Sequence, residues 1–456
     1  MAIQIFRFKL LFLLTGLLRY AGNDSSFLSE LNLVANHIKC RGAGVMQQKV
    51  DVAHSYSEAC SIELERVPVT WINRLVQLRM WLYLLLYRTL LWVLRRGVLG
   101  LRTPTPLIQP REIIVYLQGM LGDVSVHLPA VMALRVKFPA ARLICVCYSE
   151  GFPIAGLLEG LPYIDQLIVL DKHPVIRQGT KLIYSSSALE ELSADLFVNF
   201  SPFANRGVPG FLAREMVFAK KCGAKFYLGD SLALYGVPIW ARQVKRLFVR
   251  NEPRRSLRIL APLAIQPVKD TISCLPARAK LPDMSRNFPN LDLLGNYALI
   301  HPGAKHAVKL WPAEYYGKIA SQLFYEYGLQ VLITGSQAEA GIADRVVNAS
   351  GGVACNLCGL STLPEMIELI RHARIVITND TGPMHLSSLL RRPAVAIFGT
   401  RMTVRHWYPI GETTTVVMHY HEDSFSYDDD GHVPHRMENI QPEIIAIQIG
   451  LLLCAS

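Results

Sequence analysis

The sequence predicts an α/β fold of the doubly wound type from about residue 112 to its end. Short apolar segments alternate there with longer segments of helical pattern, and glycine-containing turns follow several of the apolar segments. In the first half we expect a helix at 124–138 and strands at 113–117, 143–148, 166–170 and 196–199. Such alternation is typical of parallel strands joined by crossover helices, which bind ligands at the carboxyl ends of the strands.

The second half repeats the pattern. We expect strands at 297–300, 329–334 and 375–378, helices beginning at Pro312 and Pro383, and a final helix at 442–453. The basic, proline-rich segment 242–286 reads as the end of the first domain and a linker. The predicted division is an N-terminal extension at 1–110, a first domain with its linker at 111–285, and a second domain with the final helix at 286–456.

The turn after strand 375–378 has the features of an anion site. Gly382 allows backbone geometry that other residues resist, and Pro383 suits the first position of a helix. A helix that opens there is expected to leave four N–H groups unpaired, those of Thr381, Gly382, Met384 and His385. Because the helix dipole also favours negative charge, this turn is predicted to bind a phosphate.

Two further polar side chains follow strands of the second half. The strand 297–300 runs into a His-Pro-Gly turn and then to Lys309, a cation on a loop at the carboxyl end of a strand. Glu339 follows the strand 329–334 and can accept hydrogen bonds from ribose hydroxyls. A lysine on a loop is more often simply solvated, so the prediction for Lys309 depends on the neighbouring turn.

The first half offers a carboxylate at an equivalent place. Gly122-Asp123 follows the strand 113–117 where a helix is expected to begin. An aspartate at a helix start is most often an N-cap that accepts a backbone N–H. Together with a phosphate site about 250 residues later, Asp123 is predicted to be a general base that removes a proton from an acceptor hydroxyl.

These segments resemble the heptosyltransferase family, glycosyltransferase family 9, from about Glu112 to the C-terminus. The resemblance rests on Gln118 to Asp123, His301 to Ala304, Lys309 to Pro312, Asn379 to His385 and Phe398-Gly399. It implies a GT-B architecture with two Rossmann-like domains facing a cleft. The donor nucleotide sugar is then expected in the C-terminal domain and the acceptor in the N-terminal domain. The final helix is expected to pack back across the first domain.

The resemblance also implies roles for particular residues. Asp123 matches the catalytic base, Lys309 the diphosphate-binding lysine and Glu339 the ribose-binding acid. Asp380 matches the sugar-contacting aspartate, and the phosphate-binding backbone matches Thr381, Gly382 and His385. Members typically invert the anomeric centre without a metal, so neither a cofactor nor a metal ligand is expected.

The chain departs from the family pattern in two places. Thr400-Arg401-Met402-Thr403 stands where the family usually has Pro-Thr-Asp-Pro, which leaves the identity of the donor sugar open. Roughly 110 residues also precede the first family strand. Residues 7–22 imitate a secretory signal, but we expect an uncleaved helix that touches the membrane, because a nucleotide-sugar enzyme needs its donor in the cytosol.

The N-terminal region is strongly basic. The formal net charge of the chain is +11, and residues 66–111 hold eight arginines and no acid. In the segment 71–96 the arginines are interleaved with Leu and Trp, which favours a membrane interface over nucleic acid. We expect a helix that lies on an anionic bilayer, with a spanning helix or a core helix as alternatives. The predicted location is cytoplasmic, peripheral on the inner face of the cytoplasmic membrane.

Other candidate sites are less specific. His419, His421, His432, His435 and the acidic run Asp428 to Asp430 imitate a metal site, but their spacing fits no strong template and a solvated loop is expected. Cys355 and Cys358 have no second pair, so a structural role is expected. Gly119 and Gly122 do not form a dinucleotide fingerprint, which argues against a dehydrogenase.

The sequence therefore predicts an inverting, metal-independent glycosyltransferase. The expected donor is a nucleotide diphosphate sugar, with ADP-heptose favoured, and the expected acceptor is an anionic, lipid-linked saccharide such as lipopolysaccharide core. Two alternatives remain: a non-catalytic member of the fold that binds nucleotide sugar or glycolipid, and a nucleotide-sugar epimerase of GT-B type.

Overall fold

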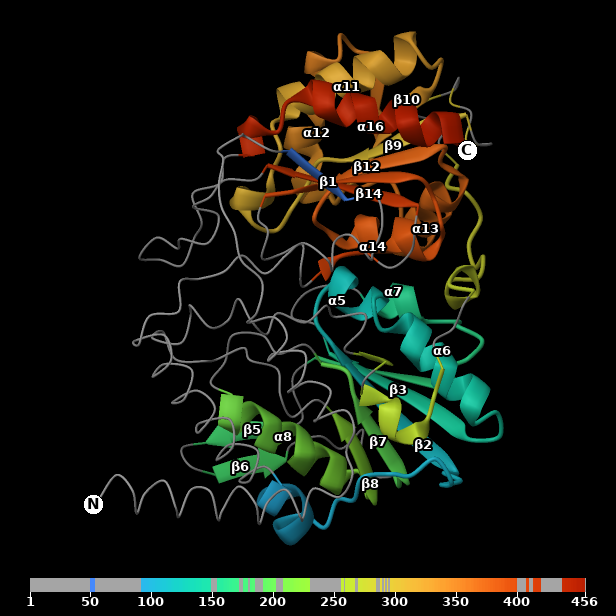
Figure 1. Ribbon diagram of the computed structural model, residues 1–456, viewed down its shortest axis with the longest axis vertical. Helices are drawn as coiled ribbons and strands as arrows, with labels where there is room; N and C mark the ends of the chain where they lie inside the picture. The colour runs from blue at the N-terminus through green and yellow to red at the C-terminus, as the bar shows by residue number, and fades with distance from the viewer. Residues whose placement is uncertain are drawn as a thin grey trace, which may run out of the picture. The chain divides into compact units, whose positions relative to one another are not determined.

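Two mostly parallel β-sheets with flanking helices form the described part of the chain (Figure 1). The computed structural model describes residues 50–53, 92–148, 154–171, 175–178, 181–184, 192–201, 208–229, 256–257, 259–266, 270–283, 288, 291, 293, 296–399, 407–409, 413–419 and 437–455. The two sheets confirm the predicted α/β class. Within these residues, no helix has the length and apolar character that crossing a bilayer requires.

The first sheet has five parallel strands in the order β4-β3-β2-β7-β8. Its strands are β2 (Glu112–Gln118), β3 (Arg142–Tyr148), β4 (Gln166–Leu170), β7 (Leu196–Asn199) and β8 (Phe226–Gly229). The helices are α5 (Leu121–Ser125), α6 (Leu128–Lys137), α7 (Ala155–Leu158) and α8 (Val208–Lys221), and a separate hairpin joins β5 (Val175–Gln178) to β6 (Lys181–Tyr184). Each predicted strand of this half is present, and the central strand β2 ends at the turn that bears Asp123.

The helix predicted at 124–138 is divided in two. α5 ends at Ser125, and α6 begins at Leu128 with Pro129 in its first turn. Proline has no N–H to donate to the carbonyl of Ser125, and its ring would clash with that carbonyl in a continuous helix. The break leaves α5 as a short helix directly after β2.

The second sheet has seven strands in the order β1-β14-β13-β12-β9-β10-β11. The strands in chain order are β1 (Val50–Ala53), β9 (Tyr297–His301), β10 (Gln330–Ile333), β11 (Ala354–Asn356), β12 (Ile375–Asn379), β13 (Ala394–Phe398) and β14 (Thr414–His419). The helices are α11 (Ala313–Tyr325), α12 (Ala340–Ala349), α13 (Leu363–His372), α14 (Gly382–Leu389) and α16 (Pro442–Ala455). The strand order reverses between β9 and β12, which is where open α/β sheets bind ligands.

The C-terminal helix packs on the second half, contrary to the expectation that it crosses back to the first domain. Ile445 and Ile449 of α16 are buried in one cluster with residues of α11 and β13. The indole N–H of Trp311 donates to the Ile440 carbonyl at 2.8 Å, just before α16 begins. The helix therefore buries its apolar side chains within the domain that carries it.

Strand β1 comes from the predicted N-terminal extension. It pairs antiparallel with β14, with Val52 opposite Val417, and forms the edge of the second sheet. The alternation Val50-Asp51-Val52 is too short to indicate a strand from the sequence alone. Residues 71–91 of the helix expected at 71–96 and the signal-like residues 7–22 lie outside the described residues.

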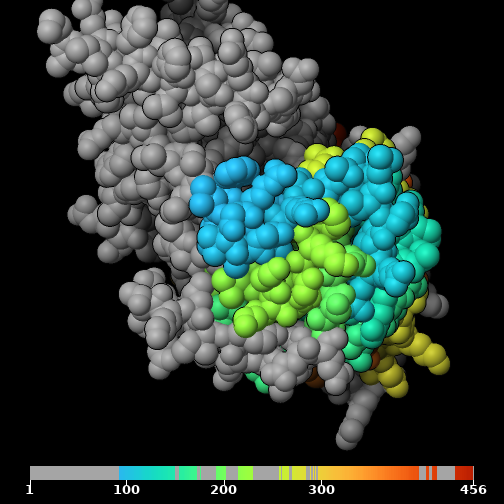
Figure 2. All heavy atoms as spheres, turned by 90° about the horizontal axis from the view of Figure 1, so that it is seen from below, coloured from blue at the N-terminus to red at the C-terminus, as the bar shows by residue number. Residues whose placement is uncertain are grey.

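Residues 92–103 form part of the edge of the first sheet. The short helix η1 (Val93–Val98) precedes Arg102, whose backbone N–H donates to Lys225 O at 2.9 Å and whose carbonyl accepts from the Tyr227 N–H at 3.0 Å. Figure 2 shows this segment, in blue, beside the green residues of α8 and β8. Leu101 is fully buried in the same cluster as Phe197. The boundary at residue 110 stays a prediction, but a truncation that keeps the first sheet intact has to retain these residues.

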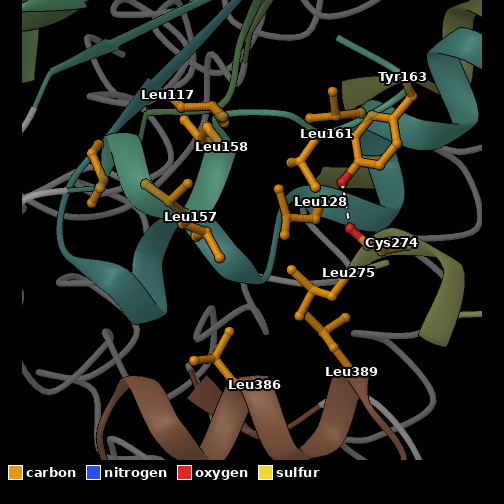
Figure 3. Close-up of a cluster of buried hydrophobic side chains, with 14 of the residues drawn as sticks. Leu117, Leu128, Leu157, Leu158, Leu161, Tyr163, Cys274, Leu275, Leu386 and Leu389 are labelled. Atoms are coloured by element: carbon orange, nitrogen blue, oxygen red, sulfur yellow. Dashed lines mark hydrogen bonds between the residues drawn. The ribbon is translucent and has the colours of Figure 1, made fainter. Parts of the chain in front are cut away.

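Apolar side chains also connect the two sheets. Leu386 and Leu389 of α14 lie in one cluster with Leu128 of α6 and with Leu275, which follows the short helix η5 (Ile272–Cys274) (Figure 3). The hydroxyl of Tyr163 donates to the Cys274 carbonyl at 2.7 Å. The linker that was predicted only as a proline-rich segment is thus held against both halves.

Candidate functional site

Asn379, the last residue of β12, joins the two turns that the sequence singles out in the second half. Its side-chain amide donates to the Pro302 carbonyl at 2.8 Å, in the turn that follows β9. Its side-chain oxygen accepts from the Tyr316 hydroxyl at 2.9 Å and from the Trp311 N–H at 3.3 Å. Asn379 is fully buried, so these bonds replace those it would make to water. The side chain therefore fixes the two turns relative to each other.

Lys309 and Asp380 form a partly buried ion pair beside these turns. Lys309 ends the short helix η6 (Ala307–Lys309), and its Nζ lies 2.7 Å from Asp380 Oδ2 and 3.3 Å from the Asp380 carbonyl oxygen. Burial raises the pKa of the Asp380 carboxyl above its usual value, and the charge and hydrogen bond of Lys309 oppose that rise. The structure thus brings the Lys309 cation, on the loop that follows β9, to the carboxyl end of β12 and pairs it with Asp380.

The N-terminus of α14 begins directly after this pair. Thr381 is the N-cap, and its hydroxyl lies 3.1 Å from the Thr378 hydroxyl. The Met384 N–H donates to the Thr381 carbonyl at 3.2 Å, so the expectation that the Met384 N–H is unpaired is wrong. The first turn of the helix thus satisfies this N–H with its own backbone. Of the four N–H groups expected from the sequence to be unpaired at this turn, the one at Met384 is therefore not available to an anion.

Gly382 is required by a close approach rather than by unusual backbone geometry. Its φ angle is not among the positive ones of the described residues, in contrast to the sequence-based interpretation. A Cβ atom at this position would lie 2.7 Å from Leu121 Cδ2. Leu121 belongs to α5 in the first half, so glycine lets α14 and α5 come into contact. The same contact brings Gly122 next to α14.

His385 is a buried, neutral imidazole at this contact. A Cβ atom on Gly122 would lie 3.1 Å from His385 Cδ2, and the ring meets Trp407 edge-on at 6.1 Å between centroids. Burial, and secondarily the charge of Lys309, lowers the pKa of His385 to about 3. Sequence reasoning gave a role only to the backbone of His385. It missed Trp407, which follows closely after residues 400–403, where the chain departs from the family pattern.

The pKa of His385 predicts an acid sensitivity of folding. The unfolded chain takes up this proton near pH 6.5 and the folded chain only near pH 3, so stability that is present above pH 6.5 is lost as the pH falls. Between pH 7.5 and 5.5 the wild type should lose about 1 kcal/mol more unfolding free energy than His385→Gln. Urea unfolding at the two pH values measures the difference. Equal losses in both proteins would contradict the assignment.

Asp123 is the third residue of α5 and is half-buried. Its Oδ2 accepts the Met120 N–H at 2.7 Å, so it caps the helix from within the first turn rather than as the N-cap residue. Gly119 has a φ of +126°, and a Cβ atom there would lie 2.4 Å from the same carboxylate oxygen. This bond orients the carboxylate, while the neighbouring Gly122 touches His385. Asp123 thus lies beside the N-terminus of α14.

Glu339 lies on the other side of the turn that follows β9. Its Oε2 accepts from the Ser336 N–H at 2.7 Å and from the Ser336 hydroxyl at 2.8 Å, which closes a capping box at the short helix η7 (Gln337–Glu339). A Cβ atom on Gly303 would lie 1.9 Å from Oε1, so the glycine of the His-Pro-Gly turn makes room for the carboxylate. Glu339 therefore has a structural role in addition to the ribose contact that the resemblance implies.

The geometry separates the predicted residues into groups. Lys309 is paired with Asp380, and Thr381, Gly382 and His385 follow directly at the start of α14, with Asp123 across the α5 contact. Glu339 stands apart, behind Gly303. No group of three or more His, Cys, Asp or Glu side chains in the described ranges could hold a metal ion. His421, His432, His435 and residues 428–430 lie outside those ranges, and of His419 only the backbone is described.

Comparisons with known proteins find similarity to the same family. The sequence profile of glycosyltransferase family 9 (heptosyltransferase) matches residues 270–430. Lipopolysaccharide heptosyltransferase 3 of Escherichia coli is 24% identical over 289 residues, which cover 61% of this chain and 80% of that protein. Lipooligosaccharide heptosyltransferase 2 of Haemophilus influenzae is 30% identical over 132 residues, which cover 27% of this chain and 38% of that protein.

A solved structure shares the fold. The glycosyltransferase family 9 protein of Veillonella parvula superposes with a TM-score of 0.56 at 18% identity, and the match covers 76% of this chain and 98% of that one. At this identity the match shows a common fold. It agrees with the two-sheet architecture expected from the resemblance.

Proposed function

We propose that the chain is a member of glycosyltransferase family 9, the heptosyltransferase family, and that it transfers a heptose with inversion from ADP-heptose to a lipid-linked, anionic saccharide such as lipopolysaccharide core. It is a glycosyltransferase, as its curated relatives are. The names of those relatives, lipopolysaccharide and lipooligosaccharide heptosyltransferases, support the sugar and the acceptor class. A cytosolic donor and a lipid-linked acceptor together support a peripheral location on the inner face of the cytoplasmic membrane.

One observation carries the proposal: a cation, a helix N-terminus and a carboxylate meet where α14 contacts α5. Lys309 and the start of α14 come from the second sheet, and Asp123 comes from the first. Transfer of a sugar from a diphosphate needs positive charge at the leaving group and a proton acceptor at the attacking hydroxyl. The contact between the two helices supports placing both requirements in one site.

On the donor side, Lys309 and the α14 N-terminus bind the diphosphate in this proposal. Lys309 Nζ now lies 2.7 Å from Asp380, so a bound diphosphate would share or replace that partner. Asp380 would then accept hydrogen bonds from the sugar hydroxyls, and Glu339 from the ribose. As the bond between the sugar C1 and the phosphate oxygen breaks, the new negative charge falls on oxygens held by Lys309 and the helix dipole.

On the acceptor side, Asp123 accepts the proton. The acceptor oxygen attacks C1 from the face opposite the leaving diphosphate, a new C–O bond forms, and the hydroxyl proton passes to the carboxylate. The hydroxyl becomes acidic late in this step, so a carboxylate within reach suffices as the proton acceptor. The N–H of Met120 keeps the carboxylate oriented through the reaction.

Activity is expected to survive metal chelation. The proposed charge stabilisation comes from Lys309 and the α14 N-terminus, so no divalent ion is required for the diphosphate to leave. Initial rates of the purified chain with and without EDTA measure this, and we expect the two rates to agree. A rate that EDTA abolishes and added metal restores would contradict metal independence.

The function is tested by identifying the products. Purified protein is incubated with ADP-, UDP- or GDP-linked sugars, with and without a deacylated lipopolysaccharide core acceptor. We expect release of ADP and a heptosylated acceptor only when ADP-heptose and acceptor are both present. An isomerised nucleotide sugar formed without acceptor would identify an epimerase. Tight nucleotide-sugar binding without any product would identify a non-catalytic binder.

A further inference from the structure

The edge of the first sheet carries exposed apolar and cationic side chains together. On the short helix η1 and just before it, Trp92 is 58% exposed and Val98 is 70% exposed. Arg96 on the same helix is exposed, as are Lys220 and Lys221 in the last turn of α8. A Cβ atom on Gly100 would lie 4.0 Å from Lys220 Nζ, which places the end of α8 against the segment that follows η1.

Local contacts hold this surface rigid. Arg95 Nη2 donates to the Tyr227 carbonyl at 2.6 Å and to the Thr103 hydroxyl at 3.0 Å, and its guanidinium lies over the Tyr227 ring. Leu101 is fully buried beneath. One arginine of η1 therefore anchors the helix, while its neighbour Arg96 faces solvent. The exposed side chains belong to a folded part of the domain.

The acids of the nearby strand ends are already engaged. Asp195 Oδ1 lies 2.9 Å from Lys225 Nζ, and Asp195 Oδ2 accepts the Arg111 N–H at 2.9 Å. Glu112 is 3.2 Å from an Arg142 guanidinium nitrogen. The cations of η1 and of the α8 end thus leave a net positive surface beside bulky apolar side chains. Such a mixture fits an anionic bilayer, because aromatic rings favour the interface and cations favour anionic headgroups.

We propose that Trp92, Arg96, Val98, Lys220 and Lys221 form a docking surface for the anionic headgroups of a lipid bilayer. In Figure 1, η1 lies near the amino end of β8, whereas the turn that bears Asp123 lies at the carboxyl end of β2. Docking through this surface leaves that turn uncovered. The inference deepens the proposed peripheral location and rests on it, but its evidence is the exposure and charge of these five residues.

The test compares two triple variants of the full-length chain. Arg96→Gln/Lys220→Gln/Lys221→Gln removes three charges from the surface, and Lys318→Gln/Arg345→Gln/Arg374→Gln removes three exposed charges from the second half. Each lost cation should lower the partition onto vesicles with anionic phosphatidylglycerol by about fivefold, so the first variant should lose about 100-fold and the second less than about twofold. Sedimentation with these vesicles and with neutral phosphatidylcholine vesicles measures the partition.

Salt and the apolar side chains separate a bilayer from other polyanions. Binding should weaken between about 0.01 M and 1 M salt, because screening shortens the range of the charges from about 30 Å to 3 Å. Trp92→Ser/Val98→Ser should also weaken vesicle binding. If that variant binds vesicles like the wild type, the surface recognises polyanions such as nucleic acid and the bilayer proposal fails. It fails equally if the surface triple variant pellets like the wild type, or if neutral vesicles bind as well as anionic ones.

Nucleotide binding is measured on the same preparations. Calorimetry with ADP reports on the donor site, and melting temperatures report on folding. A wild type that binds ADP but whose surface variants pellet unchanged overturns the docking surface and leaves the proposed function standing. If the wild type needs the surface cations for vesicle binding but transfers no sugar, the docking surface stands and the proposed function fails.

Discussion

Asp123→Asn is expected to lower kcat by a factor between about 100 and 10,000 while leaving ADP affinity unchanged. The asparagine oxygen can still accept the Met120 N–H that Asp123 Oδ2 accepts at 2.7 Å, so the α5 turn should keep its shape. An amide cannot take the proton of the acceptor hydroxyl. Steady-state rates with a soluble acceptor and calorimetry with ADP measure the two quantities on one sample.

A matched control is available at Asp270. This exposed aspartate also caps a short helix, because its Oδ1 accepts the Ile272 N–H at 3.1 Å, and Asp270→Asn makes the same chemical change away from the contact of α5 with α14. It should keep wild-type kcat. If Asp123→Asn also turns over like the wild type, the carboxylate serves only as a helix cap and the base lies elsewhere.

Lys309→Ala is expected to weaken ADP binding by roughly 10- to 100-fold, the usual effect of removing a hydrogen bond to a charged group. The cation lost is the one that lies beside the α14 N-terminus, 2.7 Å from Asp380. Lys309→Arg should retain part of the affinity because it keeps the charge. Asp380→Asn should spare ADP binding and lower transfer, because its proposed contact is with the sugar.

The ion pair with Asp380 means that Lys309→Ala can change both stability and ADP binding. A double variant separates the two effects. Asp380 is 5% exposed, so Lys309→Ala leaves a buried carboxylate without its cation and destabilises the fold. Lys309→Ala/Asp380→Asn removes that charge and should restore the melting temperature. Its ADP affinity should remain low. If the affinity returns together with stability, Lys309 acts only by neutralising Asp380, and the diphosphate is bound by other groups.

The strands and the positions of the turns could be predicted from the sequence, because they depend on local patterns. The strands at 166–170 and 196–199 form at the predicted bounds, and the turns after β2, β9 and β12 follow their strands as expected. The reason for a particular residue was harder to predict. Gly382 is needed for its approach to Leu121, about 260 residues earlier in the sequence, and no local pattern contains that information.

Contacts between distant segments account for the remaining differences. Strand β1 pairs with β14 across more than 350 residues, Arg95 of η1 donates to the Tyr227 carbonyl of β8, and Leu101 is buried in one cluster with residues of α8. A stretch of arginines looks the same in the sequence whether its members anchor a helix, as Arg95 does, or face solvent, as Arg96 does. Such roles depend on which neighbour the folded chain supplies.

The bonds of Asn379 bear on how donor preference could be redesigned. One buried amide holds the turn after β9 through Pro302, the start of α11 through Trp311 and Tyr316, and its own turn before α14. A chimaera that receives only residues 379–385 from another transferase would inherit the amide without the partners that orient it. The smallest segment that can be exchanged with its geometry intact is therefore the block from β9 to α14. Recombination between relatives should tolerate crossovers on either side of that block far better than within it.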